Sequence, residues 1–321
     1  MQFRILNTIG KDFHPEAQEI LNKLGKTDYL LLTQEDLLNE IDKHHIVVCG
    51  IGLVFSPEVL MKAKKLKLLA TVTTGLDHID LEHAKKSGIK VLSLRGENKF
   101  LNTITGTSEL ALGLMISLAR HMPQAYQSVL KGEWNRKKYN GHTLRGQTLG
   151  IVGLGRLGSI MARYGESLGM KVLYTDPNVT SENKNWRKVS LETLLKKSDF
   201  VTIYVHLDKS TRGMFNKETF GLMKKTAFLI NVSRGDIVNE KDLIEALEEK
   251  MIAGYGTDVL SGENHFVNHN ARNHPLVKYA KNHPNVMIVP HIGGMTHESR
   301  RDTDIFMSRK ILNFVKKNLK L

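Results

Sequence analysis

The chain is poor in the features that mark secreted, membrane-spanning and modular proteins. Its 321 residues contain one cysteine, Cys49, so no intramolecular disulfide can form. The N-terminus, MQFRILNTIG, lacks the charged, apolar and small-residue sections of a signal peptide. We therefore expect a cytoplasmic protein.

Long apolar runs are also missing. The most continuous one, LALGLMISLA at residues 110–119, is bounded by Glu109 and Arg120 and is about half of the roughly 20 residues that a membrane helix needs. It predicts a buried helix, and no membrane partner is expected. Low-complexity tracts and Pro/Gly/Ser-rich linkers are absent too, which favours two closely packed domains over separate modules.

Positive charge is in excess, at +13 from 46 basic and 33 acidic residues. Such a balance would suit nucleic acid or anionic metabolites. The lysines occur singly or in pairs along expected helices, without interleaved aromatic residues or a long basic run. A solvated surface therefore explains the charge, and no nucleic-acid partner is expected.

Short β-branched or leucine-rich runs alternate with helical periodicity along the whole chain, the pattern of parallel sheets flanked by helices. Strands are expected in a first series at residues 3–6, 45–49, 68–73 and 90–94. A second series is expected from residue 148, then at 171–175, 200–205, 227–232, 252–255 and 286–289. A long helix is expected from about residue 101 to 120, and a terminal helix carries Ile311, Leu312, Val315 and Leu319 at helical spacing. The fold class is α/β, with two Rossmann-like or flavodoxin-like domains.

A glycine-rich turn, Gly153-x-Gly155-x-x-Gly158, stands between an apolar strand and a helical pattern. In this context the glycines permit a tight turn, close approach of a pyrophosphate and close helix packing. Asp176 ends the next expected strand, where its carboxylate can bind the ribose hydroxyls of a dinucleotide and repel a 2′-phosphate. The motif predicts NAD as cofactor in preference to NADP.

Three further polar segments follow expected strands: Ser233-Arg234-Gly235, the segment from Asp258 to Glu263, and PHIGG at 290–294. Ligands bind at the carboxyl ends of strands in open parallel sheets. Taken singly, Arg234, Glu263 and His291 could each be an ordinary surface residue. Their common position favours a site.

The order of motifs resembles the D-isomer-specific 2-hydroxyacid dehydrogenase family over nearly the whole chain. The resemblance includes TTGLDHID at 73–80, TSEL at 107–110, KGEW at 131–134, the glycine turn, NVSRG at 231–235, residues 258–263 and PHIGG. It implies that His291 is the general acid and base, that Glu263 is its hydrogen-bonded partner, and that Arg234 binds the carboxylate and carbonyl oxygen of a 2-keto acid. The chemistry agrees, because imidazole titrates near neutral pH and a forked guanidinium can hold a carboxylate while polarising a carbonyl.

The resemblance also implies second-tier contacts. Backbone N–H groups of Thr74 and Gly75 would face the substrate carboxylate. The nucleotide contacts would be Gly153, Gly155, Arg156, Leu157, Gly158, Asp176, Val205, Val232, Ser233, Asp258 and Gly293.

The expected domains are a substrate domain of residues 1–100 and 289–321 and an NAD-binding domain of residues 101–288, with the active site in a cleft between them. The family builds a homodimer on the long helix, whose apolar residues here go nearly all the way round. We expect a homodimer.

Several alternatives stay open at this stage. A phosphoglycerate dehydrogenase-like substrate is the leading hypothesis, for which Arg95 and Lys99 could bind a phosphate. A hydroxypyruvate or glyoxylate reductase, a D-lactate dehydrogenase, and an NAD(H)-sensing binding protein like the family's corepressors are the others. Residues 264–283 carry His265, His269 and His274, but without a cysteine or acid cluster no metal site is expected.

Overall fold

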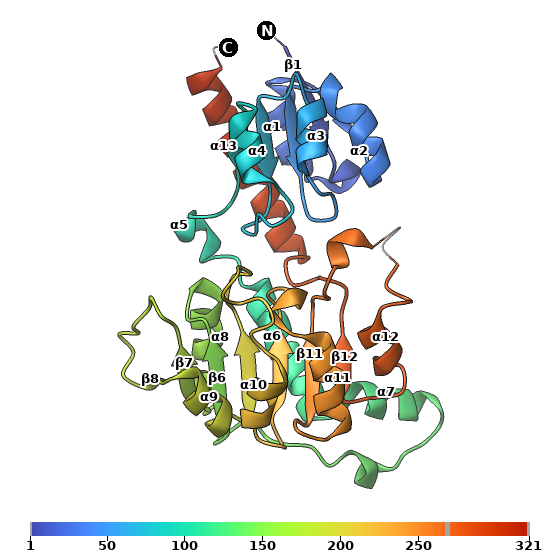
Figure 1. Ribbon diagram of the computed structural model, residues 1–321, viewed down its shortest axis with the longest axis vertical. Coiled ribbons are helices and arrows are strands. Elements are labelled where there is room, and N and C mark those ends of the chain that lie inside the picture. Colours follow the sequence, from blue (N-terminus) through green and yellow to red (C-terminus); the bar gives the residue numbers. More distant parts are fainter. Residues whose placement is uncertain (1, 267–269, 320–321) are drawn as a thin grey trace. The chain divides into compact units, whose positions relative to one another are not determined.

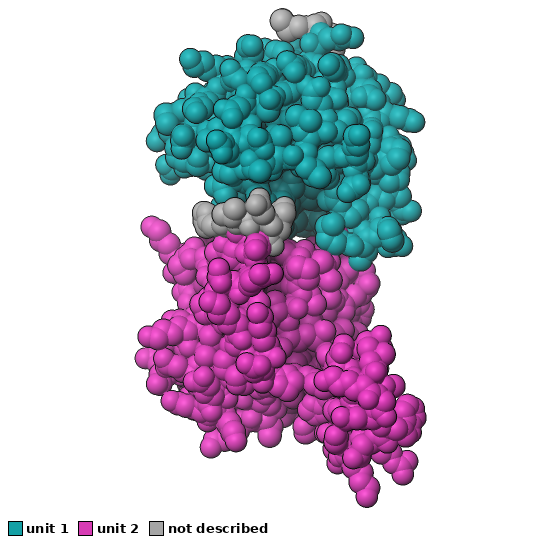
Figure 2. Space-filling model, turned by 90° about the vertical axis from the view of Figure 1, so that its right-hand side faces the viewer, with its two compact units in different colours: residues 1–103, 295–321 teal, residues 104–294 magenta. Residues whose placement is uncertain are grey.

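The computed structural model describes residues 2–266 and 270–319. Its contacts divide the chain into two compact units, coloured separately in Figure 2. Unit 1 comprises residues 1–103 and 295–321, and unit 2 comprises residues 104–294. The segment 289–321 is thus divided, and His291 lies in unit 2.

Unit 1 contains a five-stranded parallel sheet in the order β2-β1-β3-β4-β5. The strands are β1 (Phe3–Asn7), β2 (Gly25–Tyr29), β3 (Ile46–Cys49), β4 (Leu68–Thr71) and β5 (Lys90–Leu92). The helices of its N-terminal segment are α1 (Pro15–Asn22), α2 (Gln34–Glu40), α3 (Pro57–Lys62), α4 (Leu81–Lys86) and α5 (Asn98–Leu101), with 3-10 turns η1 (Gly10–Asp12) and η2 (Ile41–Lys43). The strand order is the flavodoxin-like one.

The two faces of this sheet bury separate cores. Ile46 and Val48 of β3 point into a cluster with residues of α1, while Val47 and Cys49 point into a cluster with α2 and α3. Successive side chains of a strand point to opposite faces of the sheet. Because the side chains on both faces of β3 are apolar, both faces of the sheet are covered by helices.

The terminal helix α13 (His297–Asn318) packs beside α1 in unit 1 (Figure 1). Its Met307, Ile311 and Val315 are fully buried in the same cluster as Phe3 and Leu21. The last helix of the chain is therefore part of the core of unit 1.

Unit 2 contains a seven-stranded parallel sheet in the order β12-β11-β10-β9-β6-β7-β8. The strands are β6 (Thr148–Val152), β7 (Lys171–Thr175), β8 (Trp186–Lys188), β9 (Phe200–Ile203), β10 (Phe228–Asn231), β11 (Gly254–Thr257) and β12 (Val286–Ile288). The order reverses between β6 and β9, where the doubly wound fold binds dinucleotides. The expected α/β fold class with two parallel sheets is confirmed.

Helices cover both faces of this second sheet. Buried residues of α6 (Gly106–Ala119) and α8 (Arg156–Ser167) form one core cluster with Leu149 and Ile151. The other cluster draws on α9 (Leu191–Lys197), α10 (Lys217–Leu222), α11 (Glu240–Glu248) and α12 (Pro275–Ala280). The remaining elements are α7 (Met122–Leu130) and the 3-10 turns η3 (Arg136–Tyr139), η4 (Gly235–Ile237) and η5 (Glu263–His265).

Two strands are missing from the sequence prediction, and one predicted helix is wrong. Strand β2 is not among the expected strands. Its first residue, Gly25, has φ +153° and passes so close to Phe3 that a side chain would collide with the Phe3 backbone. Strand β8 was not expected at all, since Trp186-Arg-Lys has no apolar alternation. The long helix predicted from residue 101 is interrupted after Leu101 and resumes at Gly106.

Among the residues that the structure describes, no helix is both long enough and apolar enough to cross a membrane.

Candidate active site

The glycine turn lies between β6 and α8, at the carboxyl end of β6 (Figure 1). Gly153 has φ +95°, and a Cβ on it would lie 2.9 Å from the Tyr204 carbonyl carbon. A Cβ on Gly158 would lie 2.1 Å from the Gly153 oxygen, whereas one on Gly155 would meet nothing within 4 Å. Gly153 and Gly158 therefore make the turn, and Gly155 leaves open space at the N-terminus of α8.

Asp176 follows β7 and holds the neighbouring backbone through both carboxylate oxygens. Oδ2 accepts the Leu154 N–H at 2.8 Å, which ties the acid to the middle of the glycine turn. Oδ1 accepts the N–H groups of Asn178 at 2.8 Å and Val179 at 2.9 Å. The carboxylate is thus beside the turn, as a ribose ligand would have to be, and it also has a structural role that the sequence did not reveal.

Arg156 and Leu157, at the start of α8, contact the segment that leads into α6. Arg156 Nη1 donates to the Ile104 carbonyl at 2.6 Å, and burial lowers the pKa of this guanidinium. Ser108 Oγ donates to the Leu157 carbonyl at 3.0 Å. These bonds fix α6 against the N-terminus of α8.

The ends of β9 and β10 are joined through the segment that carries Arg234. Ser233 Oγ donates to the Val205 carbonyl, and Asn231 Oδ1 accepts the Ser233 N–H at 3.0 Å. Asn231 Nδ2 donates to the Arg234 carbonyl at 2.9 Å, and Arg234 Nη1 donates to the Ser233 carbonyl at 2.8 Å. The buried Asn231 therefore holds the backbone turn that follows it, which includes Val232. The half-buried guanidinium of Arg234 projects from this turn.

Asp258 follows β11 and holds the segment after His291. Its carboxylate accepts the N–H groups of Ile292 at 2.6 Å and Gly293 at 2.8 Å, while its carbonyl accepts the His291 N–H at 2.9 Å. Burial raises the pKa of Asp258 to about 6, although the two backbone bonds oppose that shift. Gly293 packs so closely that a Cβ would lie 2.8 Å from Asp258 Oδ2.

Glu263 and His291 form a hydrogen-bonded pair, with Oε1 of the acid 2.6 Å from Nδ1 of the imidazole. Glu263 Oε2 accepts the Leu260 N–H at 3.1 Å, which orients the carboxylate. Because the Nδ1 side faces a carboxylate, Nδ1 carries a proton and Nε2 is the nitrogen left to exchange one with a ligand. The side chains are 25% and 18% exposed for His291 and Glu263, so the pair is reachable.

The backbone of His291 is in the left-handed region, at φ 51°. Few residues other than glycine adopt this conformation, and those that do are enriched at functional sites. Three bonds to Asp258 and one to the Val289 carbonyl hold this backbone in place. The imidazole therefore leaves the end of β12 in a direction that a regular strand would not give.

Thr74 and Gly75 lie after β4 in unit 1. Thr71 Oγ1 and Thr73 Oγ1 are 2.8 Å apart, and Thr73 Oγ1 donates to the Gly75 carbonyl at 2.7 Å. These bonds fold the segment back on the strand end, which is the edge at which parallel sheets bind ligands.

Sequence reasoning missed four residues around the Glu263 segment: Asp236, Glu240, Ser261 and His274. They are linked by hydrogen bonds and an ion pair in unit 2. In the sequence, His274 stands out only as one of three loop histidines. His269 lies outside the described residues, and no group of three His, Cys, Asp or Glu residues within the described part of the chain could hold a metal ion.

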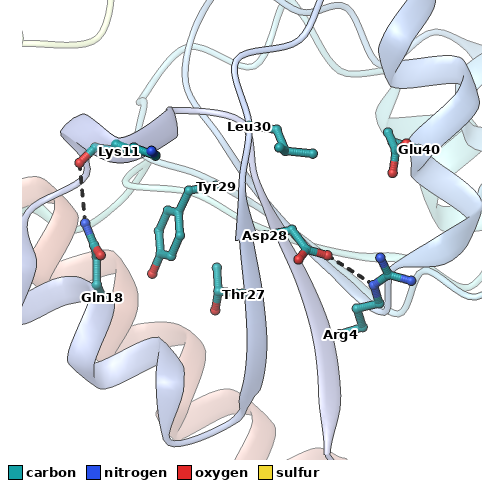
Figure 3. Close-up of a pocket in the computed structure, with 8 residues that line it drawn as sticks. All are labelled: Arg4, Lys11, Gln18, Thr27, Asp28, Tyr29, Leu30 and Glu40. Carbon is teal, nitrogen blue, oxygen red and sulfur yellow. Dashed lines mark hydrogen bonds and ion pairs between the residues drawn. The ribbon is translucent and has the colours of Figure 1, made fainter.

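A pocket of about 700 Å³ lies elsewhere, on unit 1 (Figure 3). It is lined by Arg4, Lys11, Gln18, Thr27, Asp28, Tyr29, Leu30 and Glu40. Its acid Asp28 already pairs with Arg4 Nε at 3.1 Å and His44 Nε2 at 3.0 Å. No predicted site residue is among its lining residues, so we do not assign the active site to it.

Comparison with known proteins places this geometry in context. Residues 112–293 match the family model described as D-isomer specific 2-hydroxyacid dehydrogenase, NAD binding domain. The chain is 37% identical over 290 residues to a glyoxylate reductase of Thermococcus litoralis, covering 87% of this chain and 83% of that protein. It is 33% identical over 303 residues to a D-3-phosphoglycerate dehydrogenase of Methanocaldococcus jannaschii, covering 93% of this chain and 55% of that one.

The chain spans about half the length of several curated relatives that it matches, at 52% to 55% for three phosphoglycerate dehydrogenases. Among solved structures, a D-lactate dehydrogenase from Aquifex aeolicus, complexed with NAD and lactic acid, superposes with a TM-score of 0.85. The two share 28% identity, and the match covers 99% of this chain and 96% of the other.

Proposed function

Because the chain belongs to the D-isomer-specific 2-hydroxyacid dehydrogenase family, we propose that it transfers a hydride between NAD(H) and a 2-hydroxy acid/2-keto acid pair. The observation that carries the proposal is the 2.6 Å contact between Glu263 Oε1 and His291 Nδ1, at the same sheet edge as Arg234 and the glycine turn. A general acid, an anion ligand and a dinucleotide loop are the three parts that the reaction requires.

The residues of unit 2 fit NAD. The open space over Gly155 at the N-terminus of the 12-residue helix α8 suits a pyrophosphate. Asp176, beside the turn, would bind the adenosine ribose hydroxyls. When bound, NADH supplies the hydride that reaches the 2-keto carbon.

In the proposed reduction, Arg234 binds the substrate carboxylate and polarises the keto oxygen, on which negative charge develops. His291 then donates a proton from Nε2 to that oxygen. Glu263 keeps the proton on Nδ1 and orients the ring. In the direction of oxidation, His291 accepts the proton from the hydroxyl group.

We further propose that the substrate carboxylate contacts Thr74 and Gly75 through their backbone N–H groups, at the carboxyl edge of the sheet of unit 1. The position of the 73–80 motif after β4 supports this. Exclusion of water from such a site would strengthen the bonds to the developing charge.

Phosphoglycerate dehydrogenase-like chemistry remains the leading proposal for the substrate. Three relatives of that name, at 33% to 35% identity, support it. Arg95 and Lys99 follow β5 and are exposed, so their side chains are accessible to a substrate phosphate. The 37% identity to a glyoxylate reductase favours a second candidate, reduction of a small 2-keto acid without phosphate.

The decisive experiment follows loss of NADH absorbance with 3-phosphohydroxypyruvate, hydroxypyruvate, glyoxylate and pyruvate. Turnover that is fastest with the phosphorylated acid would support the leading proposal, and turnover fastest with glyoxylate or hydroxypyruvate would replace it with the second. Tight NADH binding without turnover of any 2-keto acid would instead favour an NAD(H)-sensing binding protein.

We also propose a homodimer and a cytoplasmic location. The outward face of α7 exposes Tyr126 and Leu130, each 63% accessible, and Trp134 is 90% accessible, which is unusual for an unpartnered surface. A mass in solution near 36.2 kDa would contradict the dimer. For the location, the support is that the chain has a single cysteine, Cys49, and so forms no intramolecular disulfide.

A further inference from the structure

Ser261 is bonded through each of its polar groups to a side chain from a different part of unit 2. Its N–H donates to Glu240 Oε1 at 2.9 Å. Its carbonyl accepts from His274 Nε2 at 3.2 Å, and its hydroxyl donates to Asp236 Oδ1. The three partners come from η4, from the first turn of α11 and from the residue before α12.

The backbone beside Ser261 is held by close packing as well. A Cβ on Gly235 would lie 2.0 Å from the Leu260 carbonyl carbon and 2.2 Å from the Ser261 nitrogen. The segment that carries Arg234 therefore lies directly against the segment that carries Glu263. Neither can shift by much without moving the other.

Each of the two acids in the group also lies close to a basic side chain. Asp236 Oδ2 lies 2.5 Å from Arg212 Nη1, and Glu240 Oε2 lies 3.2 Å from His274 Nε2. The Glu240 and His274 side chains are each only 10% exposed. Because the Ser261 carbonyl has no proton to give, His274 Nε2 must carry the hydrogen in that bond.

Burial raises the pKa of Glu240, and the nearby charges of Asp236 and Glu263 act in the same direction. Holding a buried acid beside two others costs stability unless the acid is bonded. The bonds to Ser261 are therefore maintained although the burial of Glu240 near two other acids is electrostatically unfavourable.

We propose that Asp236, Glu240 and His274 form a clamp on Ser261 that positions Glu263, and through it His291, for proton transfer. The proposal rests on the proposed dehydrogenase function. Ser261 adjoins Leu260, whose N–H donates to Glu263 Oε2 at 3.1 Å. The clamp thus fixes the backbone group that orients the carboxylate, and the other oxygen of that carboxylate orients the imidazole.

The three clamp residues act as positioning residues, since they contact the segment and not the reacting atoms. Displacement of a catalytic group by about 1 Å can cost on the order of 100-fold in rate. Loss of one of three bonds to Ser261 is therefore expected to lower kcat by about 10- to 100-fold while NADH binding is kept.

The test compares His274→Ala with His274→Gln in the full chain, since glutamine retains an N–H donor for the Ser261 carbonyl. His283→Ala is the matched control, because His283 bonds to Tyr279 within the same region and does not contact Ser261. We expect kcat to fall about 10-fold or more in His274→Ala, with KM for NADH within about twofold, and to recover substantially in His274→Gln. Equal loss in both His274 variants, or wild-type kcat in a folded His274→Ala protein, would overturn the clamp.

A second variant tests the clamp with less risk of misfolding. A second measurement tests the clamp even if the proposed function is wrong. Ser261→Ala keeps both backbone bonds and loses only the bond to Asp236, so it should fold and still show a reduced kcat with unchanged NADH binding. Hydrogen exchange of the amides of residues 258–263 needs no turnover, and it should be faster in His274→Ala but not in His283→Ala. If the wild type reduces no 2-keto acid, the proposed function fails, and unchanged exchange would separately overturn the clamp.

Discussion

His291 and Glu263 come from loops 28 residues apart in the sequence, and their side chains meet at 2.6 Å between Nδ1 and Oε1. The contact determines which ring nitrogen is available, because the carboxylate retains the proton on Nδ1. Asp258 then fixes the backbone of His291 through its carbonyl and that of the next two residues through its carboxylate. Orientation of the imidazole therefore depends on two acids with different tasks.

Replacement His291→Asn should abolish turnover and leave NADH binding intact. Asparagine can keep a bond to Glu263 but cannot donate a proton to an alkoxide, so we expect kcat to fall by about 10²- to 10⁴-fold. Turnover is measured by NADH absorbance and binding by NADH fluorescence. The same substitution at His283 is the control, and undiminished kcat in His291→Asn would remove this residue from the mechanism.

Much of the fold could be predicted because parallel sheets buried on both faces leave a strong apolar signal. Strands such as β3 and β9 are buried at every position, and the helices between them keep helical periodicity. The glycine turn and the order of later motifs placed Arg234, Glu263 and His291 at strand ends. The structure brings Glu263 and His291 together, as expected.

The rest could not be predicted, because it depends on contacts that have no local pattern. Strand β2 has the polar sequence GKTDY, and only its pairing with β1 makes it a strand. The bonds around Ser261 join residues between 13 and 25 positions away, and each partner is a common surface type. The sequence indicates only that Asp176 is a ribose ligand. Its bond to the Leu154 N–H can be seen only in the structure.

Asp176→Ser should weaken NAD binding more than NADP binding. Loss of the carboxylate removes a ribose ligand and also a repulsion toward a 2′-phosphate. Because Asp176 also accepts the Leu154 N–H, affinity for both dinucleotides should fall. We expect the ratio of the Kd for NAD to the Kd for NADP to rise by about tenfold, equal to about 1.4 kcal/mol.

The matched control for that experiment is Asp199→Ser. Asp199 accepts the Thr148 N–H at 2.8 Å, at the opposite end of the same sheet from the glycine turn. Its loss can lower stability but should leave the ratio of the two dissociation constants unchanged. A ratio that moves equally in both variants would show that Asp176 does not select the cofactor.

Arg95→Ala and Lys99→Ala test for a phosphate on the substrate. If either side chain binds it, KM for 3-phosphohydroxypyruvate should rise about tenfold, since a charge-assisted bond contributes roughly 1.5 to 3 kcal/mol. KM for hydroxypyruvate should not change, because that acid lacks the phosphate. Lys90→Ala, at the exposed start of β5, is the control, and equal effects on both substrates would reject a phosphate contact.

A buried acid outside the site makes stability depend on pH. Asp304 of α13 is 1% exposed at its side chain and accepts the His14 N–H at 3.1 Å through Oδ2. Arg300 Nη2 is 3.5 Å from Oδ1, which has no hydrogen bond among the described residues. Burial raises the pKa of Asp304 from 3.8 to about 6, and the charges of Arg300 and His14 only partly oppose it.

Asp304→Asn should therefore stabilise the protein at pH 7 and have little effect below about pH 4. The folded state binds the extra proton between about pH 4 and 6, so the contribution of this carboxyl to stability falls as pH rises through that window. Asparagine keeps an oxygen for His14 without the buried charge, and we expect a gain of about 1 to 3 kcal/mol at neutral pH. Thermal melts from pH 4 to 8 measure the difference in stability between the wild type and Asp304→Asn. Asp302→Asn, at a more exposed position, is the control. If the wild type instead gains stability over the variant as pH rises, Arg300 holds Asp304 ionised.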